Sequence, residues 1–264
     1  RSFAVLDDRV RRLSAGLAGE FGLQRGDRVA VLSRNSLEYM EILLACGLGG
    51  VLVQAMNWRL SVAELGEILR ADPPEVFLFH EEFRREAEEL GSIVDCPAWV
   101  SWSADGSASE LETVVERTPY PAMRGDDEAG DDDPFLVVYT GGTTGVSKGA
   151  VHTHRTAAAA MAGNTVGERV VPTDRFMLMG QMFHSPVLLA INYLTHGCPV
   201  IMVNFKPELA LEVIQEERIT ASMGIPTMFQ NMIPPLSRGD FDVSSLRNIQ
   251  YGGSPIAQTV VREL

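Results

Sequence analysis

Short apolar runs alternate with amphipathic stretches along almost the whole chain, and this alternation restricts the fold more than any other feature. The runs expected to form strands are residues 29–32, 51–54, 75–80, 135–139, 176–179, 199–203, 220–224 and 248–251. The stretches expected to form helices are residues 6–21, 36–46, 61–70, 81–90, 155–170, 187–196, 207–217 and 227–233. Strands and helices in this order are typical of mostly parallel sheets flanked by helices. We therefore predict an α/β fold.

Polar residues mark several of the expected helix starts. Asn35 or Ser36 precedes the helix that runs to about residue 46, and either side chain is a good N-cap. Ser61 with Glu64 three residues later has the spacing of a capping box. Thr153 or His154 is expected to cap the helix that follows.

The alternation is lost over residues 103–133, which we interpret as loop and linker. Six aspartates and glutamates lie between Asp126 and Asp133. We expect two approximate halves, residues 1–125 and 134–264, joined by the acidic linker 126–133. Closely spaced like charges on a loop lack the converging geometry of a metal site, so no metal ligand is assigned to them.

Charge and hydropathy exclude several classes of protein. The chain has 22 Lys and Arg against 35 Asp and Glu, a formal net charge of −13, which disfavours nucleic acid as a partner. The apolar stretch 42–55 is shorter than the roughly 18 residues of a membrane span, and glycines interrupt it. The three cysteines, Cys46, Cys96 and Cys198, are far apart and are expected to be free thiols in a reducing compartment. We therefore expect a cytoplasmic protein with no transmembrane segment.

One segment, YTGGTTGVSKGAVHTH from Tyr139 to His154, combines four glycines and four threonines with a lysine. Glycines let successive backbone N–H groups surround a phosphate, and threonine hydroxyls add donors. Lys148 supplies a positive charge, but Gly149 follows it where a Walker loop has a hydroxyl residue. The segment GAVHTH is expected to form a return strand. The pattern predicts a loop between two strands that binds a polyanion such as ATP.

This segment closely resembles the phosphate-loop signature of the adenylate-forming superfamily, which includes acyl-CoA synthetases, aryl-CoA ligases, luciferases and adenylation domains of peptide synthetases. The matching positions are Tyr139, Thr140, Gly142, Thr143, Thr144, Gly145, Lys148, Gly149, Thr153 and His154. Gly141 replaces the usual serine, which removes one hydroxyl donor, and Ser147 replaces the usual proline. The resemblance implies that ATP is bound by Thr140, Gly141, Gly142, Thr143, Thr144, Gly145 and Lys148, with Lys148 catalytic.

Three further blocks resemble the family in the expected order. The block MGQMFHSP, residues 179–186, implies that His184 is a catalytic and substrate-binding residue at the entrance to the carboxylate pocket. In ITASMGIPTMFQNM, residues 219–232, Met228 and Phe229 are implied to line the acyl pocket, although their spacing alone is that of core residues. The block LRNIQYGGSPI, residues 246–256, implies that adenine lies against Gly252, Gly253, Ser254 and Pro255.

The resemblance implies that residues 1–264 are a truncated N-terminal adenylation domain. The β-barrel portion, the C-terminal lid domain with its lysine and the magnesium ligand are expected to lie outside the chain. The implied reaction of the full-length enzyme is ATP-dependent activation of a carboxylic acid, fatty or otherwise hydrophobic, to an acyl-adenylate, followed by thioester formation with CoA. The implied cofactors are ATP, Mg²⁺ and CoA.

Two alternatives remain beside an acyl-CoA synthetase of this type. The first is an adenylation domain that loads an amino or aryl acid onto a carrier protein. The second is a truncated nucleotide-binding fragment without turnover, and the isolated fragment is expected to be inactive.

We expect Lys148→Ala in the full-length protein to slow adenylation severely, because a carboxylate that attacks a triphosphate needs its negative charge neutralised. The rate of pyrophosphate release measures this step. An unchanged rate would show that Lys148 does not have this role.

Overall fold

The computed structural model describes residues 1–103, 109–121, 129–140 and 147–263. Its internal contacts divide the chain into two compact units, Arg1–Ala158 and Ala159–Leu264. Helix α6 (His154–Glu168) crosses this division. Thr153 caps this helix, because its hydroxyl oxygen accepts a hydrogen bond from the Thr156 N–H at 3.2 Å.

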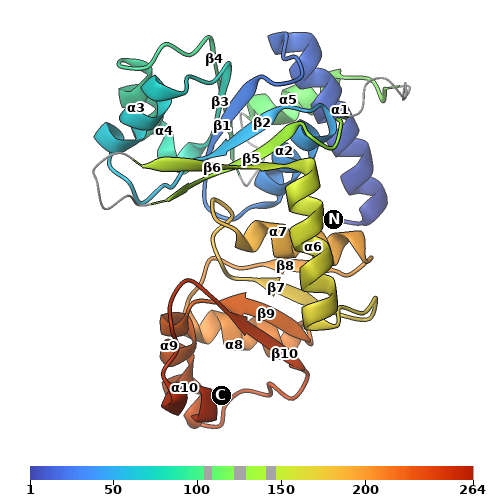
Figure 1. Cartoon of the computed structure of the whole chain (residues 1–264), viewed down its shortest axis with the longest axis vertical. Coiled ribbons are helices and arrows are strands. Elements are labelled where there is room, and N and C mark those ends of the chain that lie inside the picture. Colours follow the sequence, from blue (N-terminus) through green and yellow to red (C-terminus); the bar gives the residue numbers. More distant parts are fainter. Residues whose placement is uncertain (104–108, 122–128, 141–146, 264) are drawn as a thin grey trace. The chain divides into compact units, whose positions relative to one another are not determined.

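The first unit is built on a six-stranded sheet with the order β4-β3-β1-β2-β5-β6 (Figure 1). Its strands are β1 (Arg28–Leu32), β2 (Leu52–Ala55), β3 (Val76–His80), β4 (Ala98–Trp102), β5 (Pro134–Thr140) and β6 (Lys148–Thr153). All neighbouring strands are parallel except β5 and β6, which are antiparallel.

Helices cover both faces of this sheet (Figure 1). One face carries α1 (Phe3–Phe21), α2 (Leu37–Leu48) and α5 (Glu110–Arg117); the other carries α3 (Val62–Ala71), the short 3₁₀ helix η1 (Glu81–Phe83) and α4 (Arg84–Gly91). In β1, Ala30 and Leu32 face α3 and α4, so the alternate residues Val29 and Val31 face the opposite side. Burial on both faces explains why the strands read as continuous apolar runs.

The second unit contains a four-stranded, wholly parallel sheet with the order β10-β9-β7-β8. Its strands are β7 (Phe176–Leu178), β8 (Val200–Met202), β9 (Ala221–Gly224) and β10 (Asn248–Tyr251). Its helices besides α6 are α7 (Pro186–Thr195), α8 (Pro207–Glu216), α9 (Pro226–Ser237) and α10 (Gln258–Glu263). Helices α8, α9 and α10 contribute to an apolar cluster with Met177 of β7. On the opposite face of β7, Phe176 stacks on Tyr193 of α7 with ring centroids 4.3 Å apart.

The predicted α/β fold and most predicted elements are confirmed. Ser36 rather than Asn35 caps α2, and Ser61 and Glu64 form the predicted capping box. All three cysteines are free thiols, with Cys46 and Cys198 buried.

The interpretation of residues 103–133 as irregular is wrong for residues 110–117, which form α5. Ser109 caps this helix, and Leu111, Val114 and Val115 are buried at helical spacing. The linker-like composition on both sides of this short segment concealed its periodicity. Strand β4 was also not predicted.

The contacts divide the chain after Ala158, whereas the sequence suggested a division at residues 126–133. The difference arises because β5 and β6 follow the acidic segment and yet belong to the first sheet. The described end of that segment is held to the first unit by Asp133, which pairs with Arg25 and accepts a hydrogen bond from the Gly130 N–H at 2.7 Å. Residues 122–128 lie outside the described part of the chain.

A buried aspartate ties strands of the second sheet to the end of α6. The Asp174 side chain is 1% exposed and accepts hydrogen bonds from Arg247 Nε at 2.6 Å and Thr220 Oγ1 at 2.7 Å. Burial raises the pKa of Asp174, but Arg247, the Val171 N–H and Thr220 outweigh it and hold that pKa below its usual value. The Arg247 guanidinium also donates to the carbonyl of Glu168 at 3.3 Å, at the carboxyl end of α6.

We expect Asp174→Ala to lower the free energy of unfolding by roughly 3 kcal/mol or more, because the change leaves several buried donors and the Arg247 charge without their acceptor. Urea denaturation measures this loss. Glu89→Ala is the matched control, since it removes a carboxylate from the exposed Arg85–Glu89 pair and should change the same free energy by less than about 1 kcal/mol. Equal effects in the two variants would contradict the account of Asp174.

His154 at the start of α6 is partly buried, and its Nε2 atom is fully buried. The imidazole packs on Phe135 with centroids 5.1 Å apart, and its Nε2 atom has no hydrogen-bond partner among the described residues. Burial lowers the pKa of His154, although Asp133 and Asp131 act in the opposite direction. The folded protein therefore resists protonation of this ring more than the unfolded chain does.

The stability contributed by a neutral His154 is present above its unfolded pKa of about 6.5 and is lost as the pH falls below that value. The predicted slope is at most about 1.4 kcal/mol per pH unit. Urea denaturation between about pH 5 and pH 8 should show this slope reduced in His154→Phe, which keeps an aromatic ring on Phe135. The same pH dependence in the wild-type protein and the variant would contradict it.

Candidate functional site

Two of the predicted phosphate-binding residues meet at the carboxyl end of β5. Thr140 ends β5, Lys148 begins β6, and the two residues are partners in the antiparallel register. The Thr140 hydroxyl donates to the Lys148 carbonyl at 3.3 Å, and both residues are exposed. The predicted return strand is therefore confirmed. The remaining predicted residues of this loop lie outside the described part of the chain: Gly141, Gly142, Thr143, Thr144 and Gly145.

The next residue pair fixes the conformation at the root of this hairpin. Tyr139 is the register partner of Gly149. A Cβ atom on residue 149 would lie 2.7 Å from Val137 Cγ1 and 3.1 Å from Tyr139 Cε1. A side chain at position 149 would therefore have to displace the Val137 side chain and crowd the tyrosine ring. The glycine allows Tyr139 to pack against the strand that carries Lys148.

A cationic stack that the sequence reasoning missed lies on loops that follow β1 and β2. The guanidinium carbons of Arg34 and Arg59 are 4.2 Å and 4.4 Å from the ring centroid of Trp58. Arg34 also donates from Nε to Glu82 at 2.8 Å. Burial and the charge of Arg34 lower the pKa of Arg59. The sequence signal was a tryptophan beside an arginine after an apolar run, and an aromatic face attracts guanidinium groups in this way.

In the second unit, His184 lies between β7 and α7. The backbone N–H of His184 donates to the Gln181 carbonyl at 3.1 Å. The centroid of the His184 ring is 4.5 Å from that of the Phe183 ring. Gly180 lies in the same segment, and a Cβ atom there would come within 2.7 Å of Pro186 Cβ. His184 therefore follows the carboxyl end of β7 on a tightly packed turn.

The predicted adenine-binding residues lie at the same edge of the second sheet. Gly252 follows β10 and its N–H donates to the carbonyl of Gly224, the last residue of β9, at 3.2 Å. Gly253 has a φ of +83°, a conformation that suits glycine. Residues 252–255 and His184 thus all follow carboxyl ends of strands in one parallel sheet. Strand β8 lies on one side of β7 and β9 lies on the other, so the strand order reverses direction at β7. Ligands of open α/β sheets bind beside the carboxyl ends of the strands at such a reversal.

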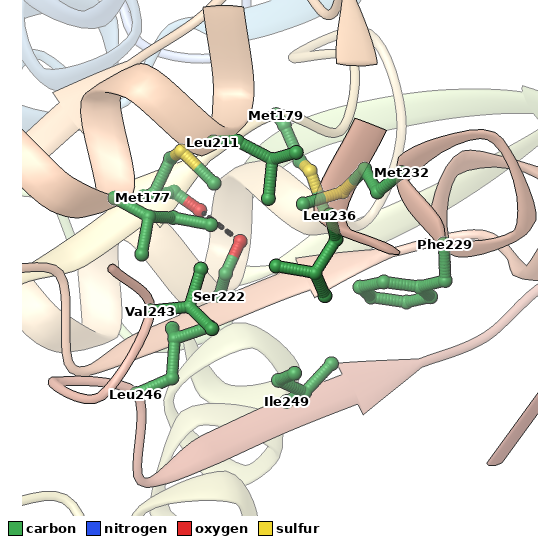
Figure 2. Close-up of a pocket in the computed structure, with 11 residues that line it drawn as sticks. Met177, Met179, Leu211, Ser222, Phe229, Met232, Leu236, Val243, Leu246 and Ile249 are labelled. Atoms are coloured by element: carbon green, nitrogen blue, oxygen red, sulfur yellow. Dashed lines mark hydrogen bonds between the residues drawn. The ribbon is translucent and has the colours of Figure 1, made fainter. Parts of the chain in front are cut away.

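A small apolar cavity lies between this sheet and helices α8 and α9 (Figure 2). Its volume is about 30 Å³, and it is lined by Met177, Met179, Leu211, Ile214, Ser222, Phe229, Met232, Leu236, Val243, Leu246 and Ile249. The Ser222 hydroxyl donates to the Met177 carbonyl at 2.9 Å. Phe229, predicted to bind substrate, is therefore a lining residue, whereas Met228 packs against the adjoining cluster without lining the cavity.

The residues that the structure describes contain no group of three or more His, Cys, Asp or Glu side chains that could hold a metal ion. Within the same residues, every helix is too short or too polar to cross a bilayer.

The fold and the sequence both resemble known enzymes. A feruloyl-CoA synthase from Amycolatopsis sp is 32% identical over 260 residues, covering 97% of this chain and 50% of that protein. A long-chain-fatty-acid–CoA ligase from Mycobacterium tuberculosis is 28% identical over 254 residues, covering 91% of this chain and 48% of that protein. The chain thus spans about half the length of the curated relatives it matches.

The inhibitor-bound N-terminal domain of FACL13 from Mycobacterium tuberculosis superposes with a TM-score of 0.87 at 25% identity, covering 98% of this chain and 65% of that one. The family model described as AMP-binding enzyme matches residues 1–264. The chain therefore belongs to the AMP-binding enzyme family, as the segment from Tyr139 to His154 predicted.

Proposed function

We propose that the full-length protein uses ATP to activate a hydrophobic carboxylic acid as an acyl-adenylate and then transfers the acyl group to CoA. The observation that carries this proposal is the β5–β6 hairpin, which presents Thr140 and Lys148 together at the carboxyl end of β5. Membership of the AMP-binding enzyme family supports it, and so does the presence of several CoA ligases among the relatives.

The residues of this chain address the electrostatic difficulty of the first step. A carboxylate must approach the α-phosphorus of a polyanionic triphosphate, so nearby negative charge has to be neutralised and the groups aligned. In this proposal the Lys148 ammonium and the Thr140 hydroxyl hold the β- and γ-phosphates that leave as pyrophosphate. Gly252, Gly253, Ser254 and Pro255 contact adenine, and His184 lies beside the carboxylate.

Mg²⁺ is the remaining cofactor that the family implies. When bound, it would neutralise phosphate charge. The described residues offer no cluster of metal-binding side chains, so no step is assigned to it.

The apolar cavity supports a hydrophobic acid rather than an amino acid. Ser222 is the single polar residue of its lining, and no carboxylate is present there to hold an ammonium group. A volume of about 30 Å³ is close to that of one water molecule, so an acyl or aryl group has to displace side chains to enter. Three methionines in the lining, Met177, Met179 and Met232, are flexible enough to move aside.

The proposal is tested by incubating the full-length protein with ATP, Mg²⁺, CoA and a panel of fatty, aryl and amino acids. We expect pyrophosphate release and CoA thioesters with the hydrophobic acids, as detected by mass spectrometry. Products attached only to an added carrier protein would favour the carrier-loading alternative. ATP binding without any product would favour a nucleotide-binding protein without turnover.

Phe229→Leu should shift selectivity toward bulkier acids, because the change removes volume from the wall of the cavity. We expect the ratio of kcat/KM for a bulky acid to that for a small acid to rise about tenfold. The adjacent change Met228→Leu is the control and should leave this ratio within about twofold, since Met228 does not line the cavity. The same shift in both variants, or in neither, would contradict the assignment of the cavity to substrate.

A further inference from the structure

A glutamine is buried in a mostly apolar face of the first sheet. Gln54 is 0% exposed and lies on β2 between Leu52 and Met56, which belong to the apolar cluster under α3 and α4. A buried amide is unfavourable unless its polar atoms find partners. A residue of this type at this position therefore needs a reason beyond packing.

The Gln54 amide nitrogen joins three elements of the first unit. Its Nε2 atom donates to the Asp72 carbonyl at 2.8 Å, just after α3, and to the Tyr139 hydroxyl oxygen at 3.2 Å, near the end of β5. The Oε1 atom of Gln54 is buried and has no hydrogen-bond partner among the described residues. The side chain thus ties the neighbouring strands β2 and β5 to the residue that follows α3, and leaves one acceptor unsatisfied.

Tyr139 is well placed to pass this restraint to the hairpin. It is the register partner of Gly149, and the next pair along the ladder is Thr140 with Lys148. A Cβ atom on residue 149 would lie 3.1 Å from Cε1 of the Tyr139 ring and 2.7 Å from Val137 Cγ1, so the ring lies close to the β6 backbone. A change in the position of the ring is therefore expected to affect β6 one residue from Lys148. Burial raises the pKa of Tyr139 to about 12, so the hydroxyl remains neutral near neutral pH.

We propose that Gln54 is a positioning residue that acts through Tyr139 to hold the root of the β5–β6 hairpin, and with it Lys148, in place for ATP. The effect of Gln54 on catalysis rests on the proposed function above. The restraint of the hairpin by Gln54 does not depend on that function, so the effect on catalysis and the restraint are tested separately.

The variant Gln54→Met separates a positioning role from a merely structural one. It keeps the length of the side chain but leaves the Asp72 carbonyl and the Tyr139 hydroxyl without this donor, so the midpoint of urea unfolding should fall modestly. In the full-length protein we expect KM for ATP to rise about tenfold while KM for the carboxylic acid stays the same. Wild-type KM for ATP in Gln54→Met would overturn the effect on catalysis.

Tyr139→Phe removes the other partner of the same hydrogen bond and should raise KM for ATP to a similar extent. The double variant Gln54→Met/Tyr139→Phe should be no worse than either single variant, because both changes break one interaction. Tyr39→Phe is the matched control, since the Tyr39 hydroxyl is also buried but has no hydrogen-bond partner among the described residues. Increases in KM for ATP that add up in the double variant, or an equal increase in Tyr39→Phe, would overturn the proposal.

Hydrogen exchange of the full-length protein without ligands tests the restraint independently of activity. In Gln54→Met the amides of β5 and β6 should exchange about tenfold faster, with those of β1 and β3 unchanged. Absence of ATP-dependent activity in the wild-type protein would contradict the proposed function, but the exchange rates would still test whether Gln54 restrains the hairpin. Unchanged exchange in β5 and β6 would overturn that restraint.

Discussion

The antiparallel pairing of β6 with β5 is the interaction on which the site in the first unit depends. Every other neighbouring pair in this sheet is parallel, and parallel strands leave the sheet through separate loops. The one antiparallel pair instead returns the chain at once, so that Thr140 and Lys148 lie opposite each other. Gly149 favours this pairing, because a Cβ atom there would lie 2.7 Å from Val137 Cγ1 and 3.1 Å from Tyr139 Cε1. The pairing thus fixes the backbone of Lys148 opposite that of Thr140.

Each unit places its candidate residues by the same physical means. Parallel sheets covered by helices leave their strand ends as the places where polar side chains can gather beside a rigid core. In the first unit these are the end of β5 and the loops that carry Arg34 and Arg59. In the second they are the segments after β7 and β10, with His184 and Gly252. The apolar cavity lies between the second sheet and helices α8 and α9, and flexible methionines in its lining make its small volume adaptable.

The sequence predicted the features that depend on local patterns. The capping box of Ser61 and Glu64, the strand before the loop and the return strand after it were all visible from residue type and spacing. Helix α5 was missed because its eight residues lie in a segment of linker-like composition. The roles of the individual site residues stay predictions, including those of Gly141 to Gly145, which the structure does not describe.

Contacts between distant segments could not be predicted from the sequence. Gln54 and Tyr139 are 85 positions apart, so their hydrogen bond appears only when β2 and β5 pair. The stack of Arg34 on Trp58 likewise requires two loops from different strands.

The most direct test of the central claim follows an oxygen atom from the substrate in the full-length protein. An accepted carboxylic acid is labelled with heavy oxygen and incubated with ATP, Mg²⁺ and CoA, and the nucleotide products are examined by mass spectrometry. Attack of the carboxylate on the α-phosphorus predicts one labelled oxygen in AMP and unlabelled pyrophosphate. Formation of ADP with labelled inorganic phosphate would show activation through an acyl phosphate and would contradict the account.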